Sequence, residues 1–451
     1  MTEKTISGGD TQTISPSQLE PMAISMADLD ESAVMTKDVQ SKVKILEDES
    51  LPLELPRLPR VLEILSHHVP AGFEHALIMS MLPVLGALAT GARFEYLHTS
   101  EIHSFSFISC LTGEAASGKS SIIRAAEKLL EVLYDEEEKT GCTRRIGEAI
   151  SQSKLLLLMD EANGKHLIAV IDEIQSIMRS WKKLTPMMRK SFDNSVFTQH
   201  YMDRKTPDGS WPVFFNMLLA GTPMKCMRFF DAQEVENGLV ERVNFVSLPD
   251  IMSPLPARIE PYTDDEEYEL LGIALHLRDF SGELTCPAVD MAIEKWLWSK
   301  FQMYEATGRR AIESFRKRAA VIGYRAGMLC YLLEKDNASF TDSDITAFAL
   351  YVAEFTLRHQ LRKFESAYDA MHAADQKVEN GAASIAAQKK PMTAPLLNLL
   401  QQEFSRDEYV KAYAITHGGS ISSERYELSR MKANGLVEEI ERGRYRKVAQ
   451  I

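Results

Sequence analysis

The chain has 451 residues, of which 45% are hydrophobic and 25% are charged. These are the values of an ordinary globular protein of roughly two to four domains, and they exclude a collagen-like chain, a disulfide-rich mini-protein and a fully disordered chain. The formal net charge of −13 excludes a surface that is basic throughout, so contact with nucleic acid is confined to local basic patches.

Residues 1–50 form an acidic leader. They hold ten acidic residues, four lysines and no aromatic residue. A segment of this composition cannot bury a hydrophobic core, so we expect it to be disordered. Residues 22–45 have some helical periodicity, which leaves folding on a partner protein as an alternative.

Residues 51–100 are expected to form an N-terminal helical segment. Three prolines within 51–60 favour an extended connector at its start. A helical pattern follows over 61–92, and its uncharged run, 76–92, is short for a membrane span of about 20 residues. We therefore expect a buried helix and no membrane contact, with a membrane span as the lesser alternative.

Strand-like and helical runs alternate along residues 93–248, which predicts an α/β fold with a mainly parallel sheet. The core of this fold is assigned to residues 101–255. Strands are expected at 93–98, 104–112, 167–171, 214–220 and 243–248, and helices at 119–135 and 144–160.

Residues 113–120 match the motif GxxxxGK[ST] without a mismatch, between an expected strand and an expected helix. Glycines let such a loop curl, so that its N–H groups and the helix N-terminus face a phosphate. We expect Lys119 to neutralise phosphate oxygens and Ser120 to ligate Mg²⁺, which makes ATP and Mg²⁺ the predicted cofactors. The predicted nucleotide-binding residues are Gly113, Glu114, Ala115, Ala116, Ser117, Gly118, Lys119, Ser120 and Ser121.

Two segments combine an apolar run with a following Asp-Glu pair. One pair is Asp160-Glu161, which follows a run of Leu and Met and precedes a helix-stop signal. The other is Asp172-Glu173, which follows a run with β-branched residues, so we choose this pair as the one at a strand end. Asp172 is expected in the Mg²⁺ shell and Glu173 as general base for the attacking water.

A turn signal at residues 207–209 predicts a β-hairpin over 201–211. Arg204 and Lys205 lie on this hairpin, where they would contact a nucleic-acid backbone. A solvated hairpin without such a contact is an equal alternative.

Two further residues follow at strand ends. Thr222 ends the strand expected at 214–220, where its hydroxyl would hydrogen-bond the γ-phosphate or the water, unless it is an ordinary turn residue. Arg242 begins the next strand and needs an anionic partner. That partner is either a carboxylate of the same chain, at Glu241 or Asp250, or the γ-phosphate of a neighbouring subunit.

Residues 256–375 have an almost wholly helical pattern and are expected to form a helical lid. Residues 376–393 are rich in Ala, Gln, Lys and Gly and are expected to be a linker.

Residues 394–451 predict a winged helix, with helices at 394–404, 407–417 and 422–434 and strands at 436–441 and 444–448. Its basic side chains favour DNA binding, in which a helix enters a groove and the wing contacts phosphates. Several nearby glutamates leave a protein-interaction module as the alternative. The expected DNA-binding residues of this domain are Arg425, Arg430, Arg442 and Arg444.

The five cysteines are far apart and form no CxxC pair. The polar N-terminus has no signal-peptide core. We therefore expect reduced thiols in a cytoplasmic protein.

The order of these motifs over residues 50–375 resembles P-loop ATPases of the AAA+ class, in particular the minichromosome-maintenance type of replicative helicase. It is most similar to an uncharacterised, primase-associated family of helicase-like ATPases of phages and mobile elements. The resemblance implies that Thr222 is a sensor, that Arg242 is an arginine finger and that Arg316 is the second sensor, with Arg318 as the alternative. The chain departs from the family pattern at two places. Thr222 stands where the family has Asn. Residues 239–243 keep only the Leu and the Arg of the family's Leu-Ser-Arg-Phe.

We therefore expect an ATP-dependent DNA-translocating motor, the replicative helicase of a phage or mobile element. It would act as a homo-oligomeric ring, a hexamer, with ATP at subunit interfaces, on single-stranded or forked DNA. Residues 1–50 would bind a primase or another replication protein. The alternative is a non-unwinding AAA+ regulator, such as a loader or a transposition or defence ATPase, whose winged helix binds a protein or a fixed DNA site.

Overall fold

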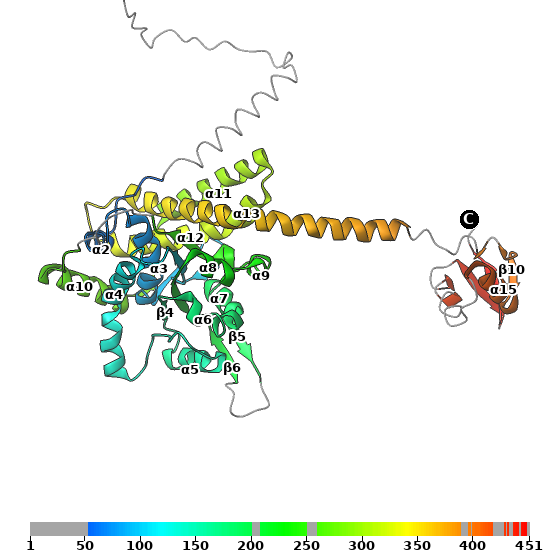
Figure 1. Cartoon of the computed structure of the whole chain (residues 1–451), viewed down its shortest axis with the longest axis horizontal. Coiled ribbons are helices and arrows are strands. Elements are labelled where there is room, and N and C mark those ends of the chain that lie inside the picture. Colours follow the sequence, from blue (N-terminus) through cyan, green and yellow to red (C-terminus); the bar gives the residue numbers. More distant parts are fainter. Residues whose placement is uncertain are drawn as a thin grey trace, which may run out of the picture. The chain divides into compact units, whose positions relative to one another are not determined.

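A computed structural model describes residues 53–200, 208–249, 259–388, 396–397, 399–417, 428–429, 431–432, 436–441 and 443–448. The chain divides into two units, Met1–Tyr368 and Asp369–Ile451, and each is described by itself. The first unit combines a parallel sheet with most of the helices (Figure 1).

Four parallel strands form the central sheet of the first unit, in the order β4-β7-β3-β8. Every residue of β3 and β7 is buried, so both faces of these two strands are covered. The prediction of an α/β fold with a mainly parallel sheet is thus confirmed. The strands are β3 (Ile108–Thr112), β4 (Leu167–Ile171), β7 (Phe215–Gly221) and β8 (Asn244–Ser247).

Helix α3 lies deepest among the helices that pack on this sheet, and it contacts all four strands. A Cβ added at its Gly86 would lie 2.6 Å from the carbonyl oxygen of Phe105, so glycine permits this close approach. The helical elements of the core are α2 (Arg60–His67), α3 (Glu74–Leu88), α4 (Lys119–Thr140), α5 (Gln152–Ala162), α6 (Ile174–Ile177), η1 (Trp181–Leu184), α7 (Thr185–Phe192), α8 (Pro223–Phe229), α9 (Ala232–Glu236) and η2 (Val240–Arg242).

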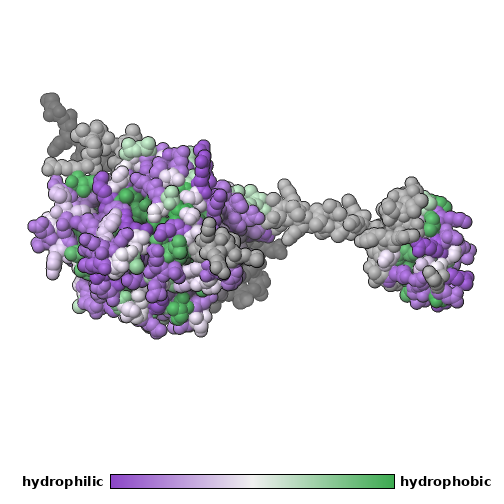
Figure 2. All heavy atoms as spheres, turned by 90° about the horizontal axis from the view of Figure 1, so that it is seen from below, coloured by the Kyte–Doolittle hydropathy of each residue, from purple (hydrophilic) through white to green (hydrophobic). Residues whose placement is uncertain are grey.

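The helical segments expected over 61–92 are two helices, α2 and α3, separated by a turn around Pro70. Proline lacks the N–H that a continuous helix needs, which explains the break. Within the described residues, no helix is both long enough and apolar enough to cross a membrane. Figure 2 shows one face of the molecule on which hydrophilic residues dominate and hydrophobic residues form small, separate patches.

The helix expected at 144–160 begins only at Gln152, where the Ser151 hydroxyl accepts a hydrogen bond from the backbone of Lys154. The preceding residues run alongside β4 instead. Arg145 and Ile168 form a parallel β-bridge, with backbone hydrogen bonds of 2.8 Å on either side. Pairing with a sheet edge therefore overrides the helical pattern at this end.

A second, small sheet has the order β2-β1-β9. The strands expected at 93–98 and 104–112 are both shorter in the structure, because the chain turns sharply between them. Leu97, His98 and Ser100 have positive φ, and Ser104–Phe107 separate β2 from β3. The strands are β1 (Gly91–Glu95), β2 (Ile102–His103) and β9 (Ser281–Glu283).

Four long helices follow the central sheet: α10 (Asp264–Asp279), α11 (Pro287–Thr307), α12 (Arg310–Glu334) and α13 (Asp342–Gln388). The helical prediction for this part holds, apart from β9. Residues 376–388 of the expected linker are helical and continue α13. Ala, Gln and Lys are strong helix formers, which favours this continuation.

The hairpin expected at 201–211 has its two arms in β5 (Val196–Gln199) and β6 (Gly209–Pro212), which pair antiparallel. Its connecting residues, 201–207, lie outside the described residues. Gly209 has a φ of +152°, which only glycine adopts readily.

The second unit contains helix α15 (Arg406–His417) and an antiparallel sheet in the order β10-β12-β11. The expected helix at 407–417 and the expected pair of strands are confirmed. The helix expected at 394–404 is wrong at its end, because Phe404 pairs with Tyr445 across the sheet. The strands are β10 (Glu403–Ser405), β11 (Val437–Glu441) and β12 (Arg444–Lys447).

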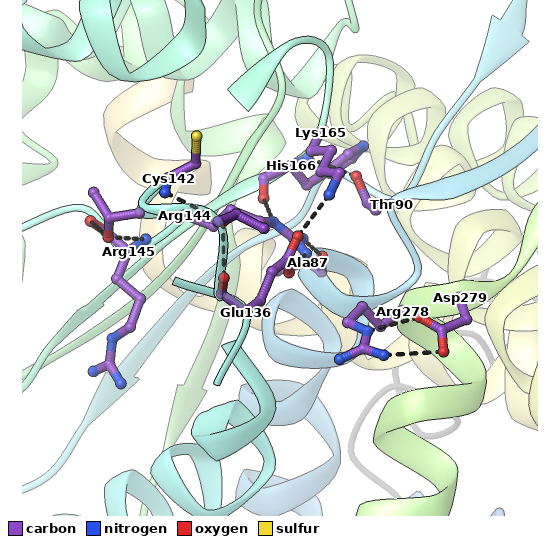
Figure 3. A network of polar contacts seen from close by, with 12 residues as sticks. Ala87, Thr90, Glu136, Cys142, Arg144, Arg145, Lys165, His166, Arg278 and Asp279 are labelled. Carbon is purple, nitrogen blue, oxygen red and sulfur yellow. Dashed lines mark hydrogen bonds and ion pairs between the residues drawn. The ribbon is translucent and has the colours of Figure 1, made fainter. Parts of the chain in front are cut away.

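A buried polar network ties α3 and α4 to the start of β4 (Figure 3). Arg144 is 2% exposed and donates to the carbonyl oxygens of His166, at 2.9 Å, and of Ala87. Its third contact is the Glu136 carboxylate, at 3.1 Å. Burial raises the pKa of Glu136, but the hydrogen bond from Lys165 and the charge of Arg144 outweigh this, and its pKa is lowered overall.

Three histidines of the first unit are held in the neutral form by burial. Burial lowers the pKa of His103 to about 3, that of His359 to about 4, and that of His166 well below its usual value. His166 is fully buried between the Ser104 hydroxyl at 2.5 Å and the Asn216 amide at 3.0 Å.

We expect the folded state to lose several kcal/mol of stability between pH 7 and pH 5. The unfolded histidines bind protons below about pH 6.5, whereas the folded ones do not, so each costs about 2 kcal/mol over this range. Urea unfolding at the two pH values measures the loss. His359→Phe, which keeps the stack against Phe355, should reduce the pH dependence, and His200→Asn at an exposed position should not. An unchanged pH dependence in His359→Phe would contradict the assignment.

Candidate functional site

The predicted phosphate loop, residues 113–120 and called the phosphate loop below, joins β3 to α4. Ala116 and Gly118 have left-handed φ values of +61° and +90°, so the backbone curls sharply before the helix. A Cβ added at Gly113 would lie 2.4 Å from the Ser117 hydroxyl. The Gly113 amide also donates to the carbonyl oxygen of Gly221 at 3.1 Å, which fastens the loop to β7.

The Lys119 ammonium is folded back over this loop and donates to the carbonyl oxygens of Gly113 and Glu114, both at 2.7 Å. Burial lowers its pKa, and the charge of Glu173 opposes this shift. Among the described residues, no carboxylate lies within ion-pair distance of Lys119. An ammonium that is held only by neutral carbonyl and hydroxyl oxygens above a helix N-terminus fits a phosphate group.

The two serines that follow Lys119 differ in their surroundings. Ser120 is exposed at the start of α4, where its hydroxyl can reach a ligand. Ser121 is 4% exposed, and its hydroxyl donates to the Gly118 carbonyl oxygen at 2.8 Å. Ser121 therefore supports the loop from within the protein.

Phe73 lies against the phosphate loop. No sequence pattern indicated this residue. Its ring would be 3.2 Å from a Cβ added at Gly118. Phe73 precedes α3 and lies about 40 positions before the loop along the chain, so no local pattern connects the two.

The acidic pair lies at the same edge of the sheet as the phosphate loop. Asp172 and Glu173 follow β4, and Asp160-Glu161 lie within helix α5, so the choice between the pairs agrees with the secondary structure. Strand β7 lies between β3 and β4, and Thr222 directly follows it. The ends of three neighbouring parallel strands thus bring the loop, Thr222 and the acidic pair together.

Two observations define the chemistry of this edge. Thr222 is the N-cap of α8, but its side chain makes no capping hydrogen bond. Glu173 is in an ion pair with Lys225 at 3.3 Å, with both side chains partly exposed. The sequence prediction did not include Lys225. Its position just after Thr222-Pro223, at the start of a helix, would have indicated it.

The residues at this edge fit ATP and Mg²⁺. The loop and Lys119 are suited to phosphate oxygens, and Ser120 and Asp172 would supply hard oxygen ligands of the kind that Mg²⁺ takes together with phosphates. Among the described residues there is no group of three or more His, Cys, Asp or Glu that would hold a metal without such a ligand.

Arg242 lies at the opposite edge of the sheet. It ends η2, just before β8, and β8 is paired in parallel with β3 from Ser109 onward. At about 3.3 Å per strand residue, Arg242 is roughly 15–20 Å from the phosphate loop of the same chain. Gln360 of α13 donates to three carbonyl oxygens around η2 and so holds this turn.

Among the described residues, the anionic partner of Arg242 is Asp193, which corrects the expectation of Glu241. The Arg242 guanidinium donates from Nε and Nη2 to the two carboxylate oxygens, at 3.2 and 3.0 Å. Asp250 lies outside the described residues. The contact joins positions 49 apart in the chain, and an Asp after a helix is no signal for it.

Arg316 also lies at this edge, on α12. Its guanidinium contacts Glu313 at 2.6 Å and lies over the Phe301 ring, 5.3 Å from its centroid. Arg318 contacts Asp193 at 3.2 Å, so one carboxylate is shared by Arg242 and Arg318. Neither Arg316 nor Arg318 is therefore placed to touch a nucleotide on the phosphate loop of its own chain.

The predicted DNA-binding residues are only partly described. Arg444 is exposed at the start of β12. Two neighbouring cations are paired with glutamates, Arg446 with Glu403 at 2.9 Å and Lys432 with Glu439. These ion pairs reduce the free positive charge of the second unit. The others, Arg204, Lys205, Arg425, Arg430 and Arg442, lie outside the described residues.

A comparison of the sequence with known protein families and with curated proteins finds no match. The function is therefore inferred from the side chains that meet at the two edges of the central sheet.

Proposed function

We propose that this protein is an ATP-dependent DNA-translocating motor of the AAA+ P-loop class, a replicative helicase that acts as a ring. Measurement of its ATP hydrolysis tests this proposal. The observation that supports this most is the meeting of the phosphate loop, Thr222 and Glu173 at the carboxyl ends of β3, β7 and β4. A curled loop beside a carboxylate pair is an arrangement suited to phosphoryl transfer to water.

Each residue at this edge has a proposed role. Lys119 and the loop amides hold the phosphates, and Ser120 and Asp172 hold Mg²⁺, which neutralises charge on the phosphates when bound. A carboxylate oxygen of Glu173 accepts the proton of the attacking water, and the Thr222 hydroxyl orients that water. The Lys225 ammonium, 3.3 Å from Glu173, stabilises the ionised carboxylate before the water is in place.

The separation of Arg242 from the phosphate loop supports a ring. A single chain offers Lys119 and Glu173 at one edge and Arg242 and Arg316 at the other, so a second copy is needed to bring them to one nucleotide. Two different edges that meet between copies form a head-to-tail contact, which generates a ring when the rotation between copies closes and an open helical filament when it does not.

The alternative function is a non-unwinding ATPase regulator that binds protein or a fixed DNA site. The ion pairs of Arg446 and Lys432 with glutamates favour it, because they leave less positive charge for a DNA backbone. A strand-displacement assay separates the two functions: the motor displaces a strand from forked DNA while hydrolysing ATP, and the regulator hydrolyses ATP without displacing it.

Glu173→Gln should bind ATP normally and lower the hydrolysis rate by about 10²–10⁴-fold, because the amide cannot accept the proton. Steady-state hydrolysis with and without single-stranded DNA measures the effect. Glu161→Gln is the matched control, since Glu161 lies on α5 and is exposed. Equal losses in both variants would contradict the assignment of the general base.

Gly118→Ala should abolish ATP binding at a stability cost of about 1–2 kcal/mol, because φ is +90° and the new Cβ would press on Phe73. Gly141→Ala is the control, since Gly141 is also left-handed, at +72°, but has nothing within 4 Å of an added Cβ. Calorimetric titration with ATP should show binding in the control alone. Retained binding in Gly118→Ala would remove the loop from the proposed site.

Arg242→Ala should bind ATP but lose turnover by about 10³–10⁵-fold, as expected of an arginine finger. Lys119→Ala should fail to bind ATP while keeping Arg242. Mixing the two inactive variants should restore part of the activity, because an Arg242→Ala subunit can then face an intact Arg242 of its neighbour. Absence of complementation in a mixed assembly confirmed by mass would argue against the role in a neighbouring subunit.

A further inference from the structure

Cys110 and Cys226 form a pair of buried thiols beside the candidate site. Cys110 lies in the middle of β3, the strand that leads into the phosphate loop, and Cys226 lies on α8, next to Lys225. Their exposed fractions are 0% and 2%, and both thiols are free. No other role in the candidate site has been assigned to either residue.

The register of the sheet places both sulfurs on the same face. The Ser109 hydroxyl donates to a carbonyl oxygen of α3 at 2.6 Å, so this side chain points to the face that α3 covers. Neighbouring residues of a strand point to opposite faces, so Cys110 points to the other face, as does Thr112. Gly221 pairs with Thr112, and the Cys226 sulfur would lie 3.1 Å from a Cβ added at Gly221. Helix α8 thus packs over β3 on the face of Cys110.

The two thiols are hydrogen-bonded to each other, which makes them chemically different. The Cys110 thiol donates to the Cys226 sulfur, and this hydrogen bond lowers the pKa of Cys226, as do the charges of Lys363 and Lys119, against the effect of burial. The same hydrogen bond and burial raise the pKa of Cys110. Because the thiolate is the attacking form of cysteine, Cys226 is suited to react first, while Cys110 keeps its proton.

Helix α8 gives a small oxidant access to Cys226. It has seven residues, and its Met224 and Met227 are 67% and 40% exposed, so it lies at the surface of the first unit. A short surface helix opens locally at a lower cost than the core of the sheet. Cys226 is therefore the thiol of the pair that an oxidant reaches first.

A covalent bond between these sulfurs would act on the candidate site. The Cys226 amide donates to the Thr222 carbonyl oxygen at 3.0 Å, and the neighbouring Lys225 pairs with Glu173 at 3.3 Å. A disulfide would fasten α8 to β3 and displace both of these residues. Small displacements of the groups around a reacting atom are costly in rate.

We propose that Cys110 and Cys226 are a reversible disulfide site, oxidised by a hydroperoxide, which slows turnover at the candidate site. The Cys226 thiolate attacks one oxygen of the hydroperoxide. An S–O bond forms, the O–O bond breaks, and the leaving oxygen takes up a proton, which leaves Cys226 as a sulfenic acid. Only the effect on turnover rests on the proposed function.

The second step closes the disulfide. The Cys110 sulfur attacks the sulfur of the sulfenic acid, so that the S–S bond forms and the S–O bond breaks. The hydroxide that leaves takes the proton of Cys110 and becomes water. Two electrons thus pass from the two sulfurs to the hydroperoxide, and a dithiol reductant returns them. Disulfides of this transient kind are compatible with a protein whose thiols are otherwise reduced.

Mass spectrometry of peptides from the full chain, treated with hydrogen peroxide and then alkylated, tests the site without requiring hydrolysis. We expect a cross-linked peptide that joins Cys110 to Cys226 and disappears with dithiothreitol. In Cys110→Ala, Cys226 should stop at the sulfenic acid, which dimedone traps. Cys142→Ala is the matched control, because Cys142 is half-buried and lies outside the pair, and it should keep the cross-link.

Hydrolysis of ATP by the same samples tests the effect on the site. Oxidation should lower the rate by about tenfold or more, because the disulfide displaces Thr222 and Lys225. Dithiothreitol should restore the rate, which separates the disulfide from oxidation of Met224 and Met227, since dithiothreitol leaves methionine sulfoxide in place. Cys226→Ala should keep its own rate in peroxide, and Cys142→Ala should lose rate as the unaltered chain does.

Absence of the cross-link, at a peroxide concentration that already oxidises Cys142, overturns the proposal. A cross-link that leaves the rate unchanged, or an equal reversible loss in Cys226→Ala, overturns the effect on turnover. The decisive cross-link is measured in the unaltered chain, so a folding defect in a variant does not affect it. A reduced chain that hydrolyses no ATP contradicts the proposed function alone, because the cross-link is detected independently.

Discussion

The shared direction of the four central strands is the constraint on which the candidate site depends. Because β3, β4, β7 and β8 are parallel, all their carboxyl ends lie at one edge and all their amino ends at the other. The phosphate loop, Thr222 and the acidic pair are therefore neighbours, although they are up to about 110 positions apart in the chain. The same constraint places Arg242 at the opposite edge, beyond reach of its own phosphate loop.

Buried polar contacts, in addition to apolar packing, hold the edge of the sheet at which the central strands begin. His166 joins Ser104 and Asn216, and Arg325 joins Ser106 and Phe192. Groups of this kind are stable in a protein interior only when their hydrogen bonds are made, so they specify how the strand starts meet. Among the described residues at this edge, the Nε of Arg325 and the Oε1 of Gln360 are exceptions, because they have no hydrogen-bond partner.

Asp193 occupies two arginines at the edge of the sheet that carries η2. It holds Arg242 and Arg318 with one carboxylate, so these arginines are positioned but occupied in the single chain. In the proposed ring, the phosphates of a neighbouring subunit compete with Asp193 for them. Hydrolysis would then depend on assembly through charge competition as well as through proximity.

The sequence by itself predicted the features that depend on residues close together along the chain. The spacing of Gly113, Gly118 and Lys119 predicted the curled loop, and the β-branched run before Asp172 separated that strand from the helix that holds Asp160. Helix and strand periods arise from local geometry, so such patterns are readable. Where local preference met a tertiary contact, as at residues 144–150 and 403–404, pairing with a sheet decided the outcome.

Only the tertiary structure decided the partners of the charged side chains. Asp193 beside Arg242, Lys225 beside Glu173 and the burial of Arg325 arise from packing between elements that are distant or differently oriented. Ion pairs and burial depend on distances in space, to which the order of residues along the chain gives no direct guide. The sequence thus determined which chemical groups the protein has, and the fold decided which of them meet.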